Sequence, residues 1–397
     1  MSGIGARLGG LTRRGGSRSP ASGQRLLFGL AAPALAILFA ALLTSLVLAA
    51  AGDSPLAAFR AMVEFGADPA SIVNILNKAT TYYLSALAVA IGFKMNLFNI
   101  GVDGQYRLAA MLAAAVGGAV NLPGPLHVAL VVVVAMLVGA AWAGIAGLLK
   151  VTRGVSEVIS TIMLNFIATG VVAFLLSTDR LAVSIQGSNN IGTRPIPESG
   201  RIPGLALVPG TGGKVFGFIV IAALAGVAYS VLLNRTRFGF DLRTTGMSES
   251  AAVASGVNVK RMIVAAMLLS GAVAGLVGMP QLLGASYSYG LDFPAGLGFT
   301  GIAIALLGRN HPVGIAIGAL LFSFLDVSSL ILDFEDVPPE IVIIMQGVIV
   351  LSVVIAYELV RRYGLVQQQR RVGEQLAAEE PDSAGPGPAA PSDEVRA

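Results

Sequence analysis

The sequence predicts an all-α polytopic membrane protein with about ten transmembrane helices. The chain has 397 residues, of which 55% are hydrophobic and 12% are charged, whereas soluble domains are about 25% charged. Its mean hydropathy is +0.79. A membrane-spanning helix needs roughly 20 mostly apolar residues, and apolar segments of about this length recur from residue 26 to residue 357.

The first half of the chain predicts five spans. Residues 26–52 form a run of 27 residues without a charge, which is too long for the apolar core of a signal peptide. Residues 108–149 are also uncharged, and Pro and Gly at 121–125 divide them into two helices joined by a tight turn. The two remaining spans are predicted at 72–93 and 158–178.

The second half predicts the other five spans, at 215–234, 262–291, 293–308, 315–331 and 341–357. The segment 293–308 is short, and it is either a complete helix extended by its flank or a broken one. Asp326 lies within the ninth span. Because ionisable groups are costly in lipid, this residue either pairs near a helix end or has a functional role.

Basic residues indicate the side of the membrane on which the chain ends lie. Lys and Arg gather before the first span, in the loop after the sixth and after the tenth, and such clusters face the cytoplasm. An even number of spans places all three clusters on one side. We therefore expect both termini to be cytoplasmic in a bacterial plasma membrane. The loop 179–214 departs from this pattern, because its four basic residues would lie outside.

Both tails lack the apolar residues of a folded domain. Residues 1–25 are rich in Gly, Ser and Arg, and residues 363–397 are rich in Pro, Ala, Glu and Asp. We expect two cytoplasmic tails, the first disordered and the second mostly so, on either side of a transmembrane domain at 26–362. The net charge of +4 therefore marks the cytoplasmic membrane face and not a surface for nucleic acid.

The sequence contains no evident catalytic or metal-binding constellation. It has no Cys, and its two histidines, His127 and His311, are far apart. The segment Gly212–Lys214 resembles part of a phosphate-binding loop, but it lacks the leading Gly and the Ser or Thr after the Lys. We therefore expect no enzymatic activity and no cofactor bound by this chain.

The segment 92–105 is the first that indicates a function. It holds five polar or charged residues and three glycines between two apolar spans. Irregular backbone at membrane depth needs protein or water to satisfy it, and such segments often line the substrate paths of transporters. The segment is either part of a path or a short cytoplasmic loop. Its candidates for a substrate path are Asn96, Asn99, Asp103 and Gln105.

The basic segment 234–258 is the longest predicted cytoplasmic loop inside the chain. Ser248 can cap a short helix, Glu249 suits its first turn and Gly256 can end it. So short a helix needs a partner, such as a groove on another protein; a solvated basic loop is the alternative. The residues expected to form the docking site are Gly246, Ser248, Glu249, Ala251, Ala252 and Gly256.

The segment 154–165 places most of its polar residues on one helical face. Glu157, Ser160, Thr161, Leu164 and Asn165 follow the spacing of such a face, which should point into the helix bundle or a cavity. Glu157 and Asn165 are therefore further candidates for a substrate path. Hydrogen bonding between helices is the alternative role of this face.

A second interrupted segment is predicted at 291–308. Gly and Pro punctuate it, and it occupies a place in the second half of the chain comparable to that of 92–105 in the first. Paired interruptions of this kind are typical of transporters that contain an internal repeat.

These segments together resemble one protein family. Asn99–Gln105, which reads NIGVDGQ, is similar to the NIG-x-E-G-Q signature of permease subunits of ABC importers. The branch concerned serves branched-chain amino acids, ribose-type sugars and nucleosides. The segment 236–256 resembles the cytoplasmic coupling loop of that family. Residues 156–165 and 298–308 are most similar to its nucleoside-type members.

The resemblance covers about residues 26–362 and implies a type II-like importer permease. Asp103 stands where the signature usually has Glu, so the negative charge is kept. Thr300 stands where an acidic residue is common, so one negative charge is lost. The implied partners are cytoplasmic ATPase subunits that hold ATP and magnesium, a second permease chain (a copy or a paralogue), an extracytoplasmic substrate-binding lipoprotein and membrane lipid. In that family the short helix around Ser248–Ala254 would sit in a groove of the ATPase and would be the coupling site.

The resemblance implies ATP-driven import of a small polar solute, with a nucleoside as the first expectation. Permeases for sugars or branched-chain amino acids are the alternatives within the family. Outside it, the alternative is an ion-coupled secondary transporter, which would need charged relays within its spans. The candidates for such a relay are Lys78, Lys94, Asp103, Glu157 and Asp326.

Overall fold

The computed structural model describes residues 38–39, 41–46, 48–49, 52–185, 190–335, 341–353, 355 and 362. The larger of its two units consists of residues 40–351. The tails predicted at 1–25 and 363–397 lie outside the described residues, as does the greater part of the predicted first span.

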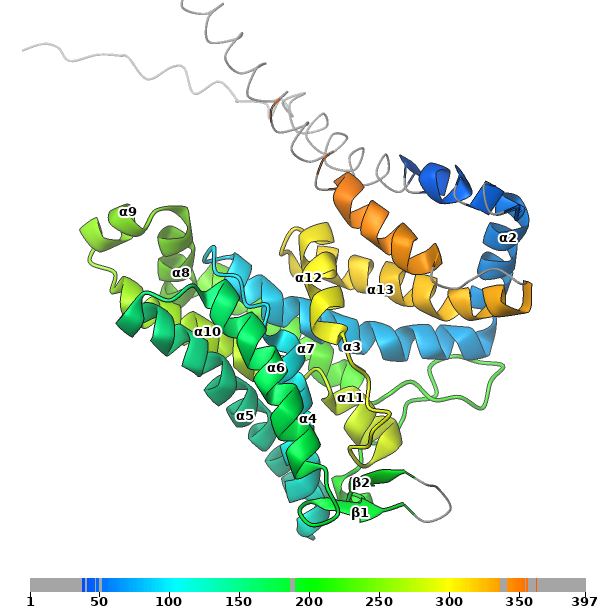
Figure 1. Cartoon of the computed structure of the whole chain (residues 1–397), viewed down its shortest axis with the longest axis horizontal. Helices are drawn as coiled ribbons and strands as arrows, with labels where there is room; N and C mark the ends of the chain where they lie inside the picture. The colour runs from blue at the N-terminus through cyan, green and yellow to red at the C-terminus, as the bar shows by residue number, and fades with distance from the viewer. Residues whose placement is uncertain are drawn as a thin grey trace, which may run out of the picture. The chain divides into compact units, whose positions relative to one another are not determined.

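Helices make up most of the described chain (Figure 1). The first half contains α2 (Pro55–Gly66), α3 (Pro69–Phe93), α4 (Val102–Ala119), α5 (Gly124–Arg153) and α6 (Glu157–Leu175). An antiparallel hairpin of β1 (Ala182–Ser184) and β2 (Ile191–Thr193) follows, and then the short 3-10 helix η1 (Glu198–Gly200). The hairpin was not expected from the sequence, which predicted helices alone.

The second half is again helical. It contains α7 (Phe218–Arg235), α8 (Arg237–Met247), α9 (Glu249–Ala254), α10 (Val259–Gly275), α11 (Met279–Gln281), the π-helical turn η2 (Leu282–Ser286), α12 (Leu297–Leu307), α13 (Pro312–Ser328) and η3 (Ser329–Glu335). A further apolar helix covers Ile341–Val353. Figure 1 shows α9 and the β1–β2 hairpin far apart.

Local signals set several helix ends. Asp68 caps α3 by accepting a hydrogen bond from the Ala70 backbone N–H at 2.9 Å, and Pro69 follows at the first helical position. α5 ends at Gly154, which adopts a left-handed φ of +69°. The turn predicted at 121–125 is confirmed, because α4 ends at Ala119 and α5 begins at Gly124.

Five segments are long and apolar enough to cross a membrane. They are Gly124–Arg153, Glu157–Leu175, Phe218–Arg235, Val259–Ser286 and Pro312–Phe334, with shorter apolar helices at Leu297–Leu307 and Ile341–Val353. Within the described residues these segments do not reach the predicted count of ten. They make the chain a multi-pass membrane protein.

The core is built around α3 and around close helix contacts. Residues 84–92 of α3 are all buried. α5 and α10 touch through small residues: a Cβ added to Gly139 would lie 2.2 Å from the carbonyl oxygen of Gly271. Small residues allow such backbone contact between membrane helices, where apolar burial alone gives little driving force.

Both predicted interruptions are present. α3 ends at Phe93 and α4 begins only at Val102, and residues 287–296 precede α12 without regular helix. α12 has 11 residues, and a helix of this length covers about 16 Å, or roughly half of the hydrocarbon core. The regular helix of the segment 293–308 is therefore confined to Leu297–Leu307 and is shorter than a complete span.

Candidate functional site

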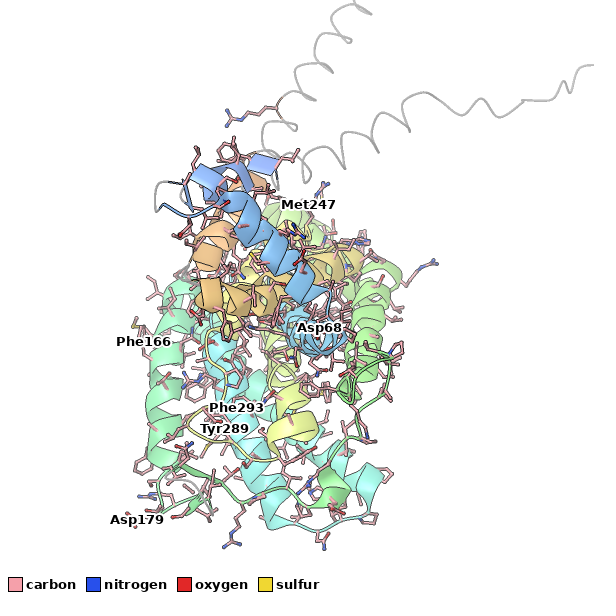
Figure 2. All side chains as sticks on the ribbon, turned by 90° about the vertical axis from the view of Figure 1, so that its right-hand side faces the viewer. Asp68, Phe166, Asp179, Met247, Tyr289 and Phe293 are labelled. Atoms are coloured by element: carbon pink, nitrogen blue, oxygen red, sulfur yellow. The ribbon has the colours of Figure 1, made fainter. Side chains whose placement is uncertain are left out.

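The short helix predicted in the 234–258 loop is confirmed as α9. The Ser248 side chain accepts a hydrogen bond from the Ala251 backbone N–H at 3.3 Å, and Glu249 occupies the first turn. Gly256, just beyond the helix, has a φ of +82°. Figure 2 shows Met247, next to α9, and Asp179, before the hairpin, at opposite ends of the described chain. α9 is therefore a capped helix at one end of the bundle.

Two apolar side chains beside α9 are exposed. Met247 is 88% exposed and Val253 is 62% exposed, whereas Ala252 is fully buried. Ala252 therefore packs α9 onto the rest of the chain, and Met247 and Val253 point outward. Such exposed apolar side chains at the tip of a membrane protein favour a docking surface.

The segment holding α8 and α9 rests directly on the first interruption. A Cβ added to Gly246 would lie 2.5 Å from the carbonyl oxygen of Lys94 and 2.8 Å from the Cα of Met95. Only Gly permits this backbone contact. Asn96 lies in the same turn, is exposed, and has a φ of +58°. A movement of α8 would therefore act on the turn between α3 and α4.

Lys94, which follows α3, lies in a basic environment. Burial, and then the nearby guanidinium groups of Arg243 and Arg309, lower the pKa of Lys94. The Lys94 backbone also belongs to the contact with α8, because its carbonyl oxygen lies beside Gly246.

Asn99 and Gln105 form a buried amide cluster with Ser270 of α10. Asn99 Nδ2 donates to Gln105 Oε1 at 3.0 Å and to Ser270 Oγ at 2.8 Å, and Gln105 Nε2 donates back to Asn99 Oδ1 at 2.8 Å. The Gly101 N–H also donates to Asn99 Oδ1, and Ser270 Oγ donates to the Ala88 carbonyl. Asn99 and Ser270 are fully buried. The cluster therefore joins α3, α4 and α10 with its own hydrogen bonds.

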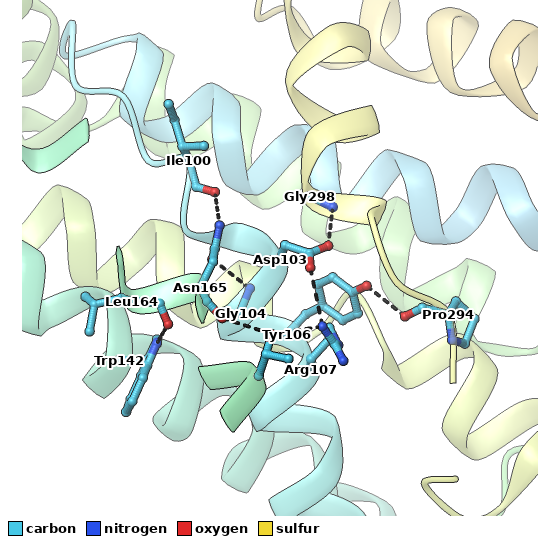
Figure 3. Close-up of polar contacts among 11 residues, drawn as sticks. Ile100, Asp103, Gly104, Tyr106, Arg107, Trp142, Leu164, Asn165, Pro294 and Gly298 are labelled. Atoms are coloured by element: carbon cyan, nitrogen blue, oxygen red, sulfur yellow. Dashed lines mark hydrogen bonds and ion pairs between the residues drawn. The ribbon is translucent and has the colours of Figure 1, made fainter. Parts of the chain in front are cut away.

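The two interruptions meet at the start of α4 and of α12, as Figure 3 shows. The Gly298 N–H donates to Asp103 Oδ1 at 3.4 Å, and the Tyr106 hydroxyl donates to the Pro294 carbonyl at 2.8 Å. A Cβ added to Gly298 would lie 2.4 Å from the Asp103 backbone N. Two helix N-termini thus approach each other inside the bundle, with the Asp103 carboxylate between them. A carboxylate is favourable there, because helix N-termini carry partial positive charge.

The predicted polar face of α6 is confirmed. Glu157, Ser160, Thr161 and Leu164 are all buried. Asn165 is half-buried; its Oδ1 accepts from the Gly104 N–H at 2.8 Å and its Nδ2 donates to the Ile100 carbonyl at 2.9 Å (Figure 3). Asn165 thereby fixes the backbone just before and within the first turn of α4.

Four of the five relay candidates lie beside an opposite charge. Glu157 accepts a hydrogen bond from Lys150 Nζ at 2.6 Å, and Asp103 Oδ2 lies 3.9 Å from Arg107. Lys78 lies 3.1 Å from Asp326, which also bonds to Tyr82 and Gln346. Asp326 therefore pairs inside the bundle and joins α3, α13 and the 341–353 helix.

Several residues of this site were not identified from the sequence. Ser270 and Gly298 contact residues 171 and 195 positions away, and no local pattern indicates these contacts. Arg107 lies four positions after Asp103, a spacing that places the two on one helical face. One signal was available: Asn74, Asn77, Lys78 and Thr81 follow the spacing of one helical face in an otherwise apolar segment. Within the described ranges, no group of three or more His, Cys, Asp or Glu residues could hold a metal ion.

Residues 71–354 match the profile of the family described as branched-chain amino acid transport system / permease component. The guanosine ABC transporter permease protein NupP of Bacillus subtilis is 37% identical over 283 residues, which cover 70% of this chain and 79% of that protein. The glucose ABC transporter permease protein TsgB13 of Haloferax volcanii is 32% identical (80% and 85% covered). The nucleoside ABC transporter permease protein NupB of Lactococcus lactis is 31% identical (81% and 89% covered).

Two of these bacteria contribute a second matching permease. NupQ of Bacillus subtilis and NupC of Lactococcus lactis are each 26% identical to this chain. Each of these two organisms therefore has two permease proteins that match this chain. No solved structure matches the chain.

Proposed function

The chain belongs to the family of branched-chain amino acid transport system permease components, and we propose that it is the membrane subunit of an ATP-driven ABC importer that carries nucleosides into the cytoplasm. Two of the three relatives compared are named for guanosine or nucleosides and one for glucose. A nucleoside is therefore the first substrate class to test, and a sugar or a branched-chain amino acid is the second.

The observation that carries this proposal is the contact between α8 and the first interruption. Met247 at the end of α8 and Val253 of α9 are exposed, and Gly246 rests on the Lys94–Met95 backbone. A partner that moves α9 would move the turn at 94–101, and through it the junction of Asp103 and Gly298. The partner we propose is a cytoplasmic ATPase that binds ATP and magnesium.

The proposed topology follows from the basic clusters. Ten spans would place both termini and the α8–α9 segment in the cytoplasm, with transmembrane residues at 26–362 and tails at 1–25 and 363–397. The hairpin and Asp179 would then face outward, where a substrate-binding lipoprotein would deliver the solute. A second permease chain would complete the pathway, and two matching permeases in each of two bacteria favour a paralogue.

The predicted path residues would have different roles. Asp103 lies in the first turn of α4, Asn165 bonds to that turn, and Glu157 begins α6, the helix that carries Asn165. All three would move when the transporter changes state. Asn99 and Gln105 would hold that start in place without touching the solute, because each of their amides is engaged within the buried amide cluster. Asn96 would take part in coupling to the ATPase, because it lies in the turn that contacts α8.

In the coupling segment, Glu249 and Ala251 would contact the ATPase, as Met247 and Val253 would. Ser248 would cap α9, Gly256 would end it, and Gly246 would transmit its movement. Ala252 would anchor the helix, because it is buried.

An ion-coupled secondary transporter is less favoured by the geometry. Such a transporter needs ionisable groups that exchange partners or protons within the spans. Lys78, Asp103, Glu157 and Asp326 each lie beside an opposite charge.

Docking by α9 can be tested with the double variant Glu249→Arg with Val253→Arg. We expect it to abolish co-purification of the ATPase and to lower ATP-driven uptake at least tenfold, since a buried unpaired charge is costly at an interface. The matched control for co-purification is Asp179→Arg with Leu207→Arg, which changes one exposed acidic and one exposed apolar residue in the 179–214 loop and should retain the ATPase. Uptake at the wild-type rate in the Glu249 and Val253 variant would refute the docking role.

A further inference from the structure

A cavity of about 260 Å³ lies between α3, the segment before α7, the α10–α11 junction and the approach to α12. Its volume is slightly below that of pockets for drug-sized ligands, which begin at about 300 Å³. None of the path residues predicted from the sequence lines it. The residues that matter for its chemistry are Asn74, Lys78, Thr81, Phe216, Gln281 and Phe293.

Three polar side chains lining this cavity have no hydrogen-bond partner within the described residues. They are the amide of Asn74, which is exposed, the amide of Gln281, which is half-buried, and the buried hydroxyl of Thr81. Their neighbour Asn77 is different: its Oδ1 accepts from the Phe216 N–H at 2.7 Å and its Nδ2 donates to the Lys214 carbonyl at 3.3 Å. The cavity thus offers two amides and a hydroxyl to a solute.

Two aromatic rings complete the walls, and the structure holds both in place. Phe293 stacks on Tyr289 with ring centroids 4.5 Å apart, and Figure 2 shows the two side by side. A Cβ added to Gly278 would lie 3.2 Å from the Phe293 ring, and one added to Gly284 would lie 2.8 Å from the Phe216 ring. Each glycine therefore leaves room for the ring beside it, and the short distance restricts the movement of that ring.

We propose that this cavity binds the base of a nucleoside. A nucleobase has an apolar face and a polar edge, and proteins bind it by stacking it on aromatic side chains and by hydrogen bonds to its edge. Phe216 and Phe293 supply the rings. Asn74, Thr81 and Gln281 supply donors and acceptors for the edge. This assignment rests on the proposed function and gives the importer a contact that distinguishes nucleosides from sugars, which have no π-face.

Lys78 adds a charge at the wall of the cavity. Its ammonium lies 3.1 Å from the Asp326 carboxylate, and about 41% of its side chain is exposed. Asp326 therefore holds the ammonium in place while leaving it accessible to an acceptor such as a base carbonyl or a ribose hydroxyl. This pair then serves recognition of the solute.

The test uses the intact importer complex, purified in detergent and reconstituted in liposomes, with radiolabelled guanosine as the probe. Thr81→Val, Gln281→Ala and Phe293→Leu should each weaken guanosine binding and slow uptake about tenfold. Thr81→Ser, which keeps the hydroxyl, should restore binding.

Two matched controls separate cavity effects from general damage. Thr80→Val changes the neighbouring threonine, whose hydroxyl bonds to the Leu76 carbonyl at 2.8 Å and which does not line the cavity. Phe166→Leu changes a ring that is 70% exposed and lies at the outer side of the chain in Figure 2. Both should behave as the wild type.

Wild-type guanosine binding and uptake in all three cavity variants would overturn the cavity assignment and leave the importer proposal intact. A wild-type complex that hydrolyses ATP and carries another solute, but neither binds nor carries guanosine, would contradict the proposed substrate and the cavity with it.

Discussion

The buried amide cluster and the cavity are built from the same kinds of side chain and differ in what those side chains contact. In the cluster, Asn99 and Gln105 bond to each other and to backbone or Ser270. In the cavity, the amides of Asn74 and Gln281 have no partner within the described residues. The first arrangement leaves no amide group for a solute to bind, and the second leaves the amides of Asn74 and Gln281 available.

This difference separates a conspicuous motif from a binding surface. The 99–105 motif stands out in the sequence because it is polar within an apolar chain, and its polarity is used to join three helices. A buried polar group without a partner costs free energy, so polar residues deep in a membrane bundle are engaged unless a cavity lets water or a solute reach them. Polarity within a span is therefore compatible with both roles, joining helices and binding a solute, and does not distinguish them.

Breaking the cluster should have the largest effect. Asn99→Leu would leave the Gln105 amide and the Gly101 N–H without a partner, at a cost of about 1–3 kcal/mol for each orphaned group. We expect this variant to lose most of its folded population, measured by thermal unfolding in detergent. Asn74→Leu, the same change at the cavity, should keep the wild-type melting temperature. Equal melting temperatures for the two variants would contradict the distinction between a structural amide cluster and a binding cavity.

The two glutamines should separate stability from transport. Gln281→Leu should leave the melting temperature unchanged and lower guanosine uptake about tenfold, because it removes a contact with the solute only. Gln105→Leu should lower the melting temperature, because it leaves the Asn99 amide unsatisfied. Parallel melting curves and uptake rates give both readouts. A lower melting temperature in Gln281→Leu, together with an unchanged one in Gln105→Leu, would contradict the account.

Gly246→Val tests whether α8 acts on the amide cluster through the 94–97 turn. Its side chain would meet the Lys94 and Met95 backbone and push α8 away from the turn. We expect ATP hydrolysis to continue while guanosine uptake per ATP falls roughly 5- to 150-fold, the usual range of a lost coupling between sites. Gly170→Val is the matched control, because nothing lies within 4 Å of a Cβ at that position. An unchanged ratio of uptake to hydrolysis in Gly246→Val would count against this route.

Lys94→Gln should have the smallest effect. Burial and two nearby guanidinium groups lower the pKa of Lys94 in the folded state, so the unfolded state binds its proton more tightly and the protonated lysine disfavours folding. The glutamine should raise the melting temperature at pH 7 by on the order of 1–2 °C. The gain should shrink as the pH rises towards the usual lysine pKa of about 10.4. Melting curves at pH 7 and pH 10 measure it; a lower melting temperature for the variant at pH 7 would contradict the sign.

Local and periodic features of the structure were predictable from the sequence. α9 was predicted because its cap, its first turn and its terminating Gly lie within nine residues, from Ser248 to Gly256. The buried face of α6 was predicted because its residues recur at helical spacing. The two interruptions were predicted from Gly and Pro.

Contacts between distant segments were not predictable in this way. The bond from Asn99 to Ser270 joins residues 171 positions apart, and Ser270 lies in an apolar helix that gives no sign of it. The contact of Gly298 with Asp103 depends on two half-helices meeting in space. The polar stripe of Asn74, Lys78 and Thr81 was visible, but only the folded chain places Phe216, Gln281 and Phe293 around it.

The central claim is that this chain carries a solute only when an ATPase drives it. The most direct measurement is uptake of radiolabelled guanosine into proteoliposomes, made either with the complete complex and ATP or with this chain alone under proton and sodium gradients. The account predicts uptake with the complete complex and ATP, and none with the chain alone under either gradient. Gradient-driven uptake by the chain alone would contradict it.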